Sequence, residues 1–268
     1  MNFDSTQAEQ ILSEAFSIYR FEQVLLELVQ PAMVDIGERW HRGEINVAVE
    51  HFATQFVRRK LAGLLSIFEG SAHRATVVVG CAPGELHDLG ALLSALFLVR
   101  RGWHVIYLGP QVPLFDLLET VHSLKPNMVC LSASTMETAL ELIPVARGLT
   151  EAYPQVHFGY GGRVFNINPE LRHSMPGVFL GQDARELVDI TGQLQSGGSL
   201  PASECVYACG LRDDRIAGDL PRGLHRNAWL AAGCLANRPE AGAPTRCRHT
   251  HLMLVITFGC MAARDIRT

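Results

Sequence analysis

The sequence lacks both an apolar run long enough to cross a bilayer and a large excess of one charge. Its longest apolar runs, such as residues 252–258, fall far short of the ~20 residues that a transmembrane helix needs. With 23 basic and 27 acidic residues, the formal net charge is -4, which gives no global attraction to nucleic acid or to an anionic membrane. Residues 1–10 are polar and acidic, unlike a secretory signal peptide. We therefore expect a cytoplasmic protein without membrane association.

Two further absences narrow the chemistry that the chain can perform. No Gly-x-Gly-x-x-Gly stands at the first predicted strand-to-helix turn, so the sequence carries no dinucleotide-binding fingerprint. No nucleophile and base form a recognisable pair, and we therefore expect no enzyme activity. Cys81 and Cys130 fall in predicted core strands, where free cysteine serves as a small apolar residue.

Residues 1–70 repeat apolar side chains at helical spacing, which predicts a bundle of helices. Asn46 is a suitable N-cap for the last of these helices. Pro31 falls inside the preceding helix, where its missing backbone N–H is expected to kink or split the helix near Gln30. Few residues precede Ser5, which leaves open an incomplete bundle.

Residues 74–196 alternate short apolar strands with helices. Strands are expected at 76–81, 104–108, 127–132, 156–160 and 177–180, and helices near 88–101, 114–123, 137–152 and 183–194. This alternation predicts an α/β domain with a Rossmann-like or flavodoxin-like five-stranded parallel sheet. Residues 197–268 follow a linker-like segment and lose any regular period, so we predict a low-order tail there.

The most informative stretch runs from Gly84 to Gly90 and joins a predicted strand to a predicted helix. It places His87 in a loop, with Glu85 two residues before it and Asp88 one residue after it. Ligands of open α/β sheets bind at the carboxyl ends of the strands. A neutral imidazole there can ligate a metal while a neighbouring carboxylate fixes its tautomer. The stretch therefore indicates a cofactor site.

Two more loops at predicted strand ends carry small or hydroxyl side chains. Ser132-x-Ser134 closes the third strand, and Gly161-Gly162 closes the fourth. In a flavodoxin-like strand order the first and third strands flank the switch point, so these loops would rim one crevice with His87. Each feature alone is common in surface loops and turns. Their combination at matching strand ends favours a site for a bulky ligand, whose heterocycle the hydroxyls can hydrogen-bond.

The combined pattern resembles the cobalamin-binding domain. Its residues are Glu85, His87, Gly90, Ser132, Ser134, Gly161 and Gly162. The family commonly has Asp at the first position, and the light-sensing branch has Glu, as this chain does. The resemblance implies that His87 is the lower axial ligand of cobalt and that Glu85 or Asp88 orients it. It also implies that the displaced dimethylbenzimidazole tail of the cofactor lies along the serine and glycine loops.

A second signal lies in the helical segment, where Trp40 and the pair Glu50-His51 flank a predicted turn at Gly43. In an antiparallel helical hairpin these side chains would lie at similar height and face one cavity. Without further context they would be a core tryptophan beside a solvated Glu-His pair. The segment resembles the cap of CarH-type adenosylcobalamin photoreceptors. That resemblance implies that Trp40 covers the upper face of the cofactor, that Glu50 contacts the adenosyl group, and that His51 binds cobalt after light breaks the cobalt–carbon bond.

The resemblance covers residues 8–195 and implies a cobalamin-binding sensory protein, light-responsive through adenosylcobalamin. It would act in transcriptional regulation through protein contacts, as a homo-oligomer or with a regulatory partner. The helix-turn-helix domain of those photoreceptors has no counterpart here, so we expect no direct DNA binding. Two alternatives stay open. One is a corrinoid carrier protein of a methyltransferase system that uses methylcobalamin, and the other is an antirepressor that binds haem or another tetrapyrrole.

Overall fold

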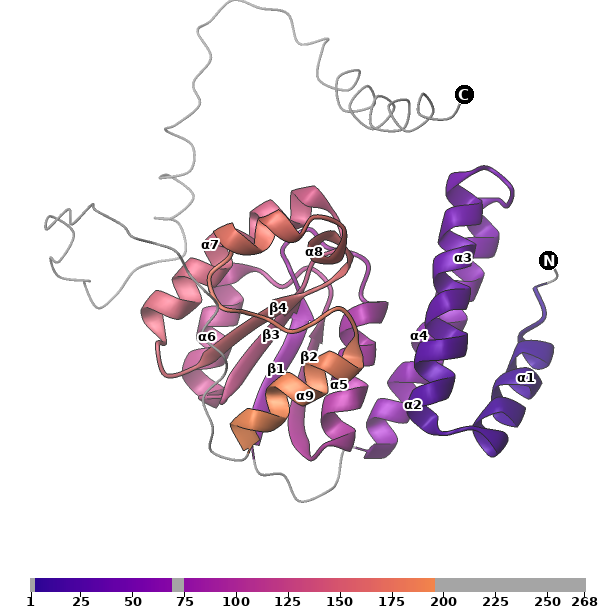
Figure 1. Cartoon of the computed structure of the whole chain (residues 1–268), viewed down its shortest axis with the longest axis horizontal. Coiled ribbons are helices and arrows are strands. Elements are labelled where there is room, and N and C mark those ends of the chain that lie inside the picture. The colour runs from indigo at the N-terminus through magenta and orange to yellow at the C-terminus, as the bar shows by residue number, and fades with distance from the viewer. Residues whose placement is uncertain (1–2, 69–74, 196–268) are drawn as a thin grey trace, which may run out of the picture. The chain divides into compact units, whose positions relative to one another are not determined.

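A computed structural model describes residues 3–68 and 75–195 of the chain (Figure 1). These residues form N-terminal helices followed by an α/β domain with a five-stranded parallel sheet, which confirms the predicted fold class. The predicted low-order tail lies outside the described residues. The domain limits predicted at residues 70, 74 and 196 also fall there and stay predictions.

The sheet has the flavodoxin-like strand order β2-β1-β3-β4-β5. Its strands are β1 (Ala75–Cys81), β2 (Trp103–Gly109), β3 (Met128–Ser132), β4 (His157–Gly161) and β5 (Val178–Phe179). The order reverses between β1 and β3, so the chain leaves these two strands toward opposite faces and a crevice opens between the loops. The register pairs Cys81 with Ser132 and Ser132 with Gly161. The three loops with predicted site residues therefore begin at the same height.

Helices cover both faces of the sheet. Leu89–Arg100 (α5) and Ala184–Gln195 (α9) pack on one face, and Leu114–Leu124 (α6) and Met136–Ala152 (α7) pack on the other. A short helix α8 (Arg163–Ile167) and a 3-10 turn η2 (Pro169–Ser174) lie between β4 and β5. The sequence pattern did not predict these two elements, because neither is long enough to display a period.

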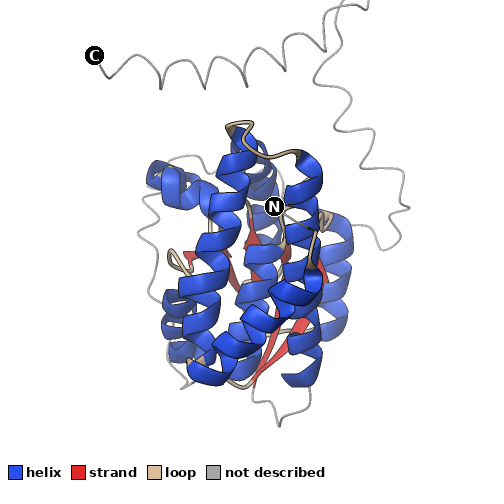
Figure 2. Ribbon diagram, turned by 90° about the vertical axis from the view of Figure 1, so that its right-hand side faces the viewer, coloured by secondary structure: helices blue, strands red, loops and turns tan. Residues whose placement is uncertain are grey.

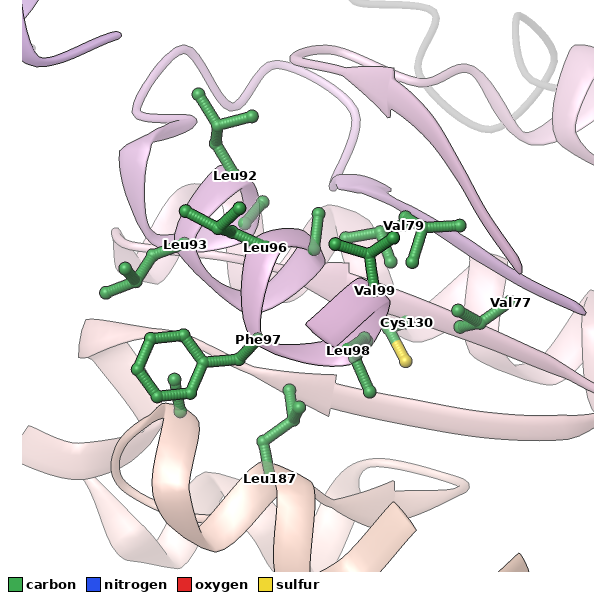
Figure 3. Packing of buried hydrophobic residues seen from close by; sticks show 14 of the residues in the cluster. Val77, Val79, Leu92, Leu93, Leu96, Phe97, Leu98, Val99, Cys130 and Leu187 are labelled. Carbon is green, nitrogen blue, oxygen red and sulfur yellow. The ribbon is translucent and has the colours of Figure 1, made fainter. Parts of the chain in front are cut away.

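The core explains why α5 is apolar on all sides. Val77 and Val79 of β1 lie in the same buried cluster as Leu96 of α5 and Leu187 of α9, on one face of the sheet (Figure 3). Val78 points to the other face and belongs to the second buried cluster. The outer side of α5 is covered in turn by Leu61 of the N-terminal helices. A helix enclosed from both sides loses no free energy by lacking a polar face.

The described part of the N-terminal segment is almost entirely helical (Figure 2). Its elements are α1 (Ser5–Ile18), a continuous run of α2 (Phe21–Gln23), the π-helical η1 (Val24–Val29) and α3 (Gln30–His41), and finally α4 (Val47–Phe68). The disturbance predicted at Pro31 is a change of helix type, because η1 ends at Val29, two residues before the proline, and the proline occupies the first turn of α3. The predicted cap is confirmed, since Asn46 Oδ1 accepts from Val49 N at 3.1 Å.

Helix α4 packs along α5, and among the described residues three ion pairs join the N-terminal helices to the α/β domain. Their atoms are Arg58 Nη2 and Asp88 Oδ1, Arg100 Nε and Glu22 Oε1, and Arg185 Nη2 and Glu27 Oε1. Within the described ranges, no helix has both the length and the apolar character that crossing a membrane requires.

Candidate cofactor site

Glu85 and His87 lie in the loop after β1 and are hydrogen-bonded to each other. Glu85 Oε1 accepts from the His87 backbone N–H at 2.8 Å and lies 2.7 Å from Nδ1 of the ring. Glu85 is buried, whereas 73% of the His87 side chain is exposed. A carboxylate at Nδ1 fixes the proton on that nitrogen and leaves the Nε2 lone pair for a ligand. The same hydrogen bond raises the pKa of His87 above its usual value, against an opposing effect of burial.

The second oxygen of Glu85 is held from another part of the chain. Oε2 accepts from Ser134 N at 2.5 Å and from the Thr138 hydroxyl at 2.9 Å. Burial alone would raise the pKa of Glu85, but hydrogen bonds from His87, Ser134 and Thr138 lower it to about 2. The carboxylate therefore stays ionised, with donors on both oxygens that compensate for its burial.

Thr138 is a site residue that sequence reasoning missed. It belongs to the capping box at the start of α7, in which the Thr135 hydroxyl accepts from Thr138 N. The spacing Thr135-x-x-Thr138 could have revealed the cap. It carries no sign of the long-range contact with Glu85.

The two acids beside His87 have different partners. Glu85 holds the imidazole, whereas Asp88 faces Arg58 and Tyr107. Asp88 Oδ1 accepts from Arg58 Nε at 2.9 Å and lies 2.5 Å from Nη2, and Oδ2 accepts from the Tyr107 hydroxyl at 3.2 Å. Of the two carboxylates considered for orienting the ring, only Glu85 contacts it among the described residues.

A cavity of about 570 Å³ opens in front of His87, within the ~300–1,000 Å³ range typical of ligand sites. It lies between the carboxyl ends of the strands and the inner faces of η1, α3 and α4. The predicted residues that line it are Glu50, His87, Asp88, Gly90, Ser132, Ser134, Gly161 and Gly162. The three loops chosen from the sequence thus meet at one cavity, with the buried Glu85 behind His87.

Glycines shape this cavity in two different ways. Gly90 and Gly161 line it, and a Cβ at either position would meet nothing within 4 Å, so their small size leaves room for a ligand. Gly162 has φ +114°, and a Cβ there would lie 2.1 Å from the Ala133 carbonyl oxygen. Gly162 is therefore required by the close approach of two loops and not by a ligand.

The cap residues predicted to share one cavity do not all do so. Glu50 lines the cavity, and its Oε1 accepts from the Thr54 hydroxyl at 2.6 Å. Trp40, at the end of α3, is 47% exposed, and 71% of the His51 side chain is exposed. Neither belongs to the cavity lining. His51 follows Glu50 by one position, which turns its side chain roughly 100° around α4, and at this point of the helix that turn takes it out of the lining.

This arrangement defines a cofactor-binding α/β protein with a helical segment beside the carboxyl edge of its sheet. The residues suit a cobalt corrinoid, because a buried carboxylate orients an imidazole whose other nitrogen can face a metal in a roomy cavity. Two family models, each described as a B12 binding domain, match residues 1–65 and 75–190. The chain belongs to this family of cobalamin-binding proteins.

Individual relatives include a regulator and corrinoid proteins. The chain is 33% identical over 153 residues to the HTH-type transcriptional repressor CarH of Myxococcus xanthus, over 57% of this chain and 51% of that protein. It is 28% identical over 156 residues to the trimethylamine corrinoid protein of Methanosarcina barkeri, over 56% of this chain and 72% of that one. The monomethylamine corrinoid protein of Methanosarcina barkeri superposes with a TM-score of 0.62 at 17% identity, over 72% and 93% of the two chains, which confirms the fold. The chain spans about half the length of CarH.

Proposed function

We propose that this protein is a cobalamin-dependent sensor that responds to light through adenosylcobalamin and acts in transcriptional regulation through protein contacts. The observation that carries the proposal is that His87, held by Glu85, and Glu50 of α4 line the same cavity. A ligand bound there touches both the sheet domain and the N-terminal helices. A chemical change in that ligand can therefore alter the packing of the helices, which is the requirement for a two-state switch.

The sheet domain holds the cofactor in this proposal. His87 Nε2 would bind the cobalt of the cofactor, and Glu85 would set the ring orientation through Nδ1. Ser132, Ser134 and the Gly161-Gly162 pair hold the tail of the cofactor, with Gly90 leaving space beside the ring. When bound, adenosylcobalamin supplies a cobalt–carbon bond that light can break.

In this proposal the helical segment responds to the chemical state of the bound cofactor. Glu50 lines the cavity, and in this proposal it contacts the upper ligand of the adenosyl form. Trp40 and His51 lie outside the cavity lining, so their proposed roles, shielding the upper face and binding cobalt after illumination, require the ends of α3 and α4 to move. The output is a changed surface of these helices, presented to a second copy of the chain or to a regulatory protein in the cytoplasm.

A corrinoid carrier in methyl transfer is the second candidate, with methylcobalamin as cofactor. It is supported by the similarity to the trimethylamine corrinoid protein and needs the same His87 site. A carrier must open its upper face to a methyltransferase, but residues of η1, α3 and α4 that line the cavity do not separate the two candidates, because the monomethylamine corrinoid protein superposes over 72% of this chain, more than the α/β domain alone. We favour the sensor because the first motif position is Glu85, the residue that the resemblance to the light-sensing branch implies. A haem-binding antirepressor would hold a different chromophore, and reconstitution with cobalamin distinguishes it from the sensor.

The test is reconstitution of the purified protein with adenosylcobalamin in the dark, followed by absorption spectra before and after green light. We expect a dark complex whose spectrum changes irreversibly on illumination, together with a change in elution volume on size exclusion. His87→Ala should weaken binding or restore the spectrum of the base-on cofactor, whereas His122→Ala, an exposed histidine of α6, should behave as wild type.

Three results would count against the sensor. Binding of methylcobalamin together with methylation by a partner enzyme would favour the carrier. Retention of haem in place of cobalamin would favour the antirepressor. A dark complex that is unchanged by green light would remove the photoreceptor role and leave cobalamin binding alone.

A further inference from the structure

Helix α4 presents a polar line to the cavity. Glu50, Thr54 and Arg58 are spaced four residues apart, so they lie on one face of the helix, and all three line the cavity. Glu50 and Thr54 are hydrogen-bonded to each other, whereas Arg58 reaches across to Asp88. At one end of this line, Glu50 is the residue proposed to contact the upper ligand. At the other end, Arg58 contacts Asp88, which is adjacent to His87.

Asp88 is anchored from two sides. Its side chain is 6% exposed, and Arg58 of α4 and Tyr107 of β2 both donate to it. Burial, and then the negative charge of Asp88, raise the pKa of Tyr107, so its hydroxyl remains a donor. Because Asp88 directly precedes α5 and directly follows His87, whatever holds this carboxylate also holds the backbone from which the imidazole projects.

The other two ion pairs between the helices and the α/β domain differ from this one. Arg185 and Glu27 have side chains that are 51% and 53% exposed, and those of Arg100 and Glu22 are 30% and 34% exposed. Of the three pairs, Arg58–Asp88 alone lies in the cavity lining. Exposed pairs contribute only about 0–1 kcal/mol, whereas a buried carboxylate that loses its partner is costly.

We propose that Arg58 is a positioning residue that couples the loop of His87 to α4 through Asp88. A shift of α4 at Glu50 then changes the position of His87, and a change in the ligation of His87 shifts α4. Arg58 need not touch the cofactor for this role. The inference rests on the proposed function in one respect, namely that His87 is the ligand of cobalt.

The experiment compares Arg58→Met with Arg185→Met, which removes an ion pair between the same two parts of the chain but away from the cavity. In the cofactor-free protein we expect amide hydrogen exchange of residues 84–90 and of α4 to accelerate about tenfold in Arg58→Met, as a loss of ~1.4 kcal/mol would produce. Arg185→Met should leave residues 84–90 unchanged. Arg58→Lys should restore part of the protection, because it keeps the charge but loses the fixed guanidinium geometry.

Cobalamin gives a second readout. Arg58→Met should bind adenosylcobalamin about tenfold more weakly, with a larger fraction in the spectrum that lacks imidazole ligation. Equal exchange rates and equal spectra in Arg58→Met and Arg185→Met would overturn the inference. Should Arg58→Met fail to fold, Arg58→Lys and Tyr107→Phe decide the question by the same exchange measurement. A wild-type protein that binds no cobalamin would refute the proposed function, while the exchange data would still decide whether Arg58 couples the two parts.

Discussion

The Nδ1 atom of His87 lies 2.7 Å from Oε1 of Glu85, and this contact decides which nitrogen of the ring faces the cavity. The same oxygen accepts from the backbone N–H of His87, so the carboxylate holds the residue at two points. The other oxygen reaches Thr138 of α7. Glu85 thus ties the histidine loop to a helix that begins about fifty residues later in the chain.

Acid titration should reveal the ionised Glu85 in the cofactor-free protein. Its folded pKa of about 2 lies below the usual value of 4.5 for a glutamate, so its contribution to stability is fully present above about pH 4.5 and is lost as the pH falls toward 2. The shift corresponds to roughly 3 kcal/mol. Glu85→Gln should therefore lower the free energy of unfolding near neutral pH and flatten its decline in acid. Urea unfolding at several pH values measures both effects, and parallel pH profiles of the two proteins would contradict this account.

Thr138→Val should weaken the support of Glu85. The substitution keeps the shape of the side chain but removes the hydroxyl that donates to Oε2, and a lost hydrogen bond to a charged group costs about 1.5–3 kcal/mol. Chemical denaturation should show this loss, and NMR titration of the cofactor-free protein should show an altered pKa of His87.

Two variants on the same helix serve as controls for this prediction. Thr138→Ser retains a hydroxyl and should remain close to wild type. Thr150→Val removes only local hydrogen bonds to the Ala146 and Arg147 carbonyls and should leave the titration of His87 unchanged. An unaltered pKa of His87 in Thr138→Val would mean that the hydrogen bond from Thr138 does not affect the contact of Glu85 with His87.

The two adjacent glycines of the third loop should respond in opposite ways to alanine. Gly161→Ala adds a methyl group that meets no protein atom within 4 Å, so folding stability should change little while cobalamin binding weakens. Gly162→Ala must accommodate φ +114° and a contact with the Ala133 carbonyl, so it should destabilise the protein itself by at least ~1 kcal/mol. Thermal unfolding and cobalamin titration separate the two effects. Similar unfolding temperatures for both variants would refute the distinction.

The sequence predicts the strands and the meeting of the three loops because these depend on local periods and on one topological rule. The continuous apolar run of β1, which is buried on both faces, and the flavodoxin-like order suffice to bring His87, Ser132 and Gly161 to one edge. Arg58 contacts Asp88, 30 positions away, and Thr138 contacts Glu85, 53 positions away. Contacts over such separations leave no periodic pattern in the sequence from which they could be predicted. Helical rise placed Trp40 and Glu50 at similar height, but it did not determine which way each side chain points, so only Glu50 lines the cavity.

Glu50 and His51 are adjacent in α4, but of the two only Glu50 lines the cavity, and this difference leads to a final prediction. Glu50 lines the cavity, and hydrogen bonds from Thr54 and His51 lower its pKa although burial opposes them, so it is ionised there. Glu50→Ala should weaken dark binding of adenosylcobalamin about tenfold, the effect of ~1.4 kcal/mol, and leave methylcobalamin binding nearly unchanged. His51→Ala should bind both forms normally in the dark, because its side chain is 71% exposed and outside the cavity lining.

After illumination, His51→Ala and not Glu50→Ala should be the variant that differs from wild type. If His51 reaches cobalt only after the cobalt–carbon bond breaks, His51→Ala should give an altered light-state spectrum, whereas the small amount of Glu50→Ala that binds should reach the wild-type light state. Equilibrium titrations in the dark and spectra after green light measure the two halves separately. A dark-binding defect in His51→Ala equal to that of Glu50→Ala would mean that both side chains face the cofactor from the start, and that the end of α4 is already turned toward the cavity before light acts.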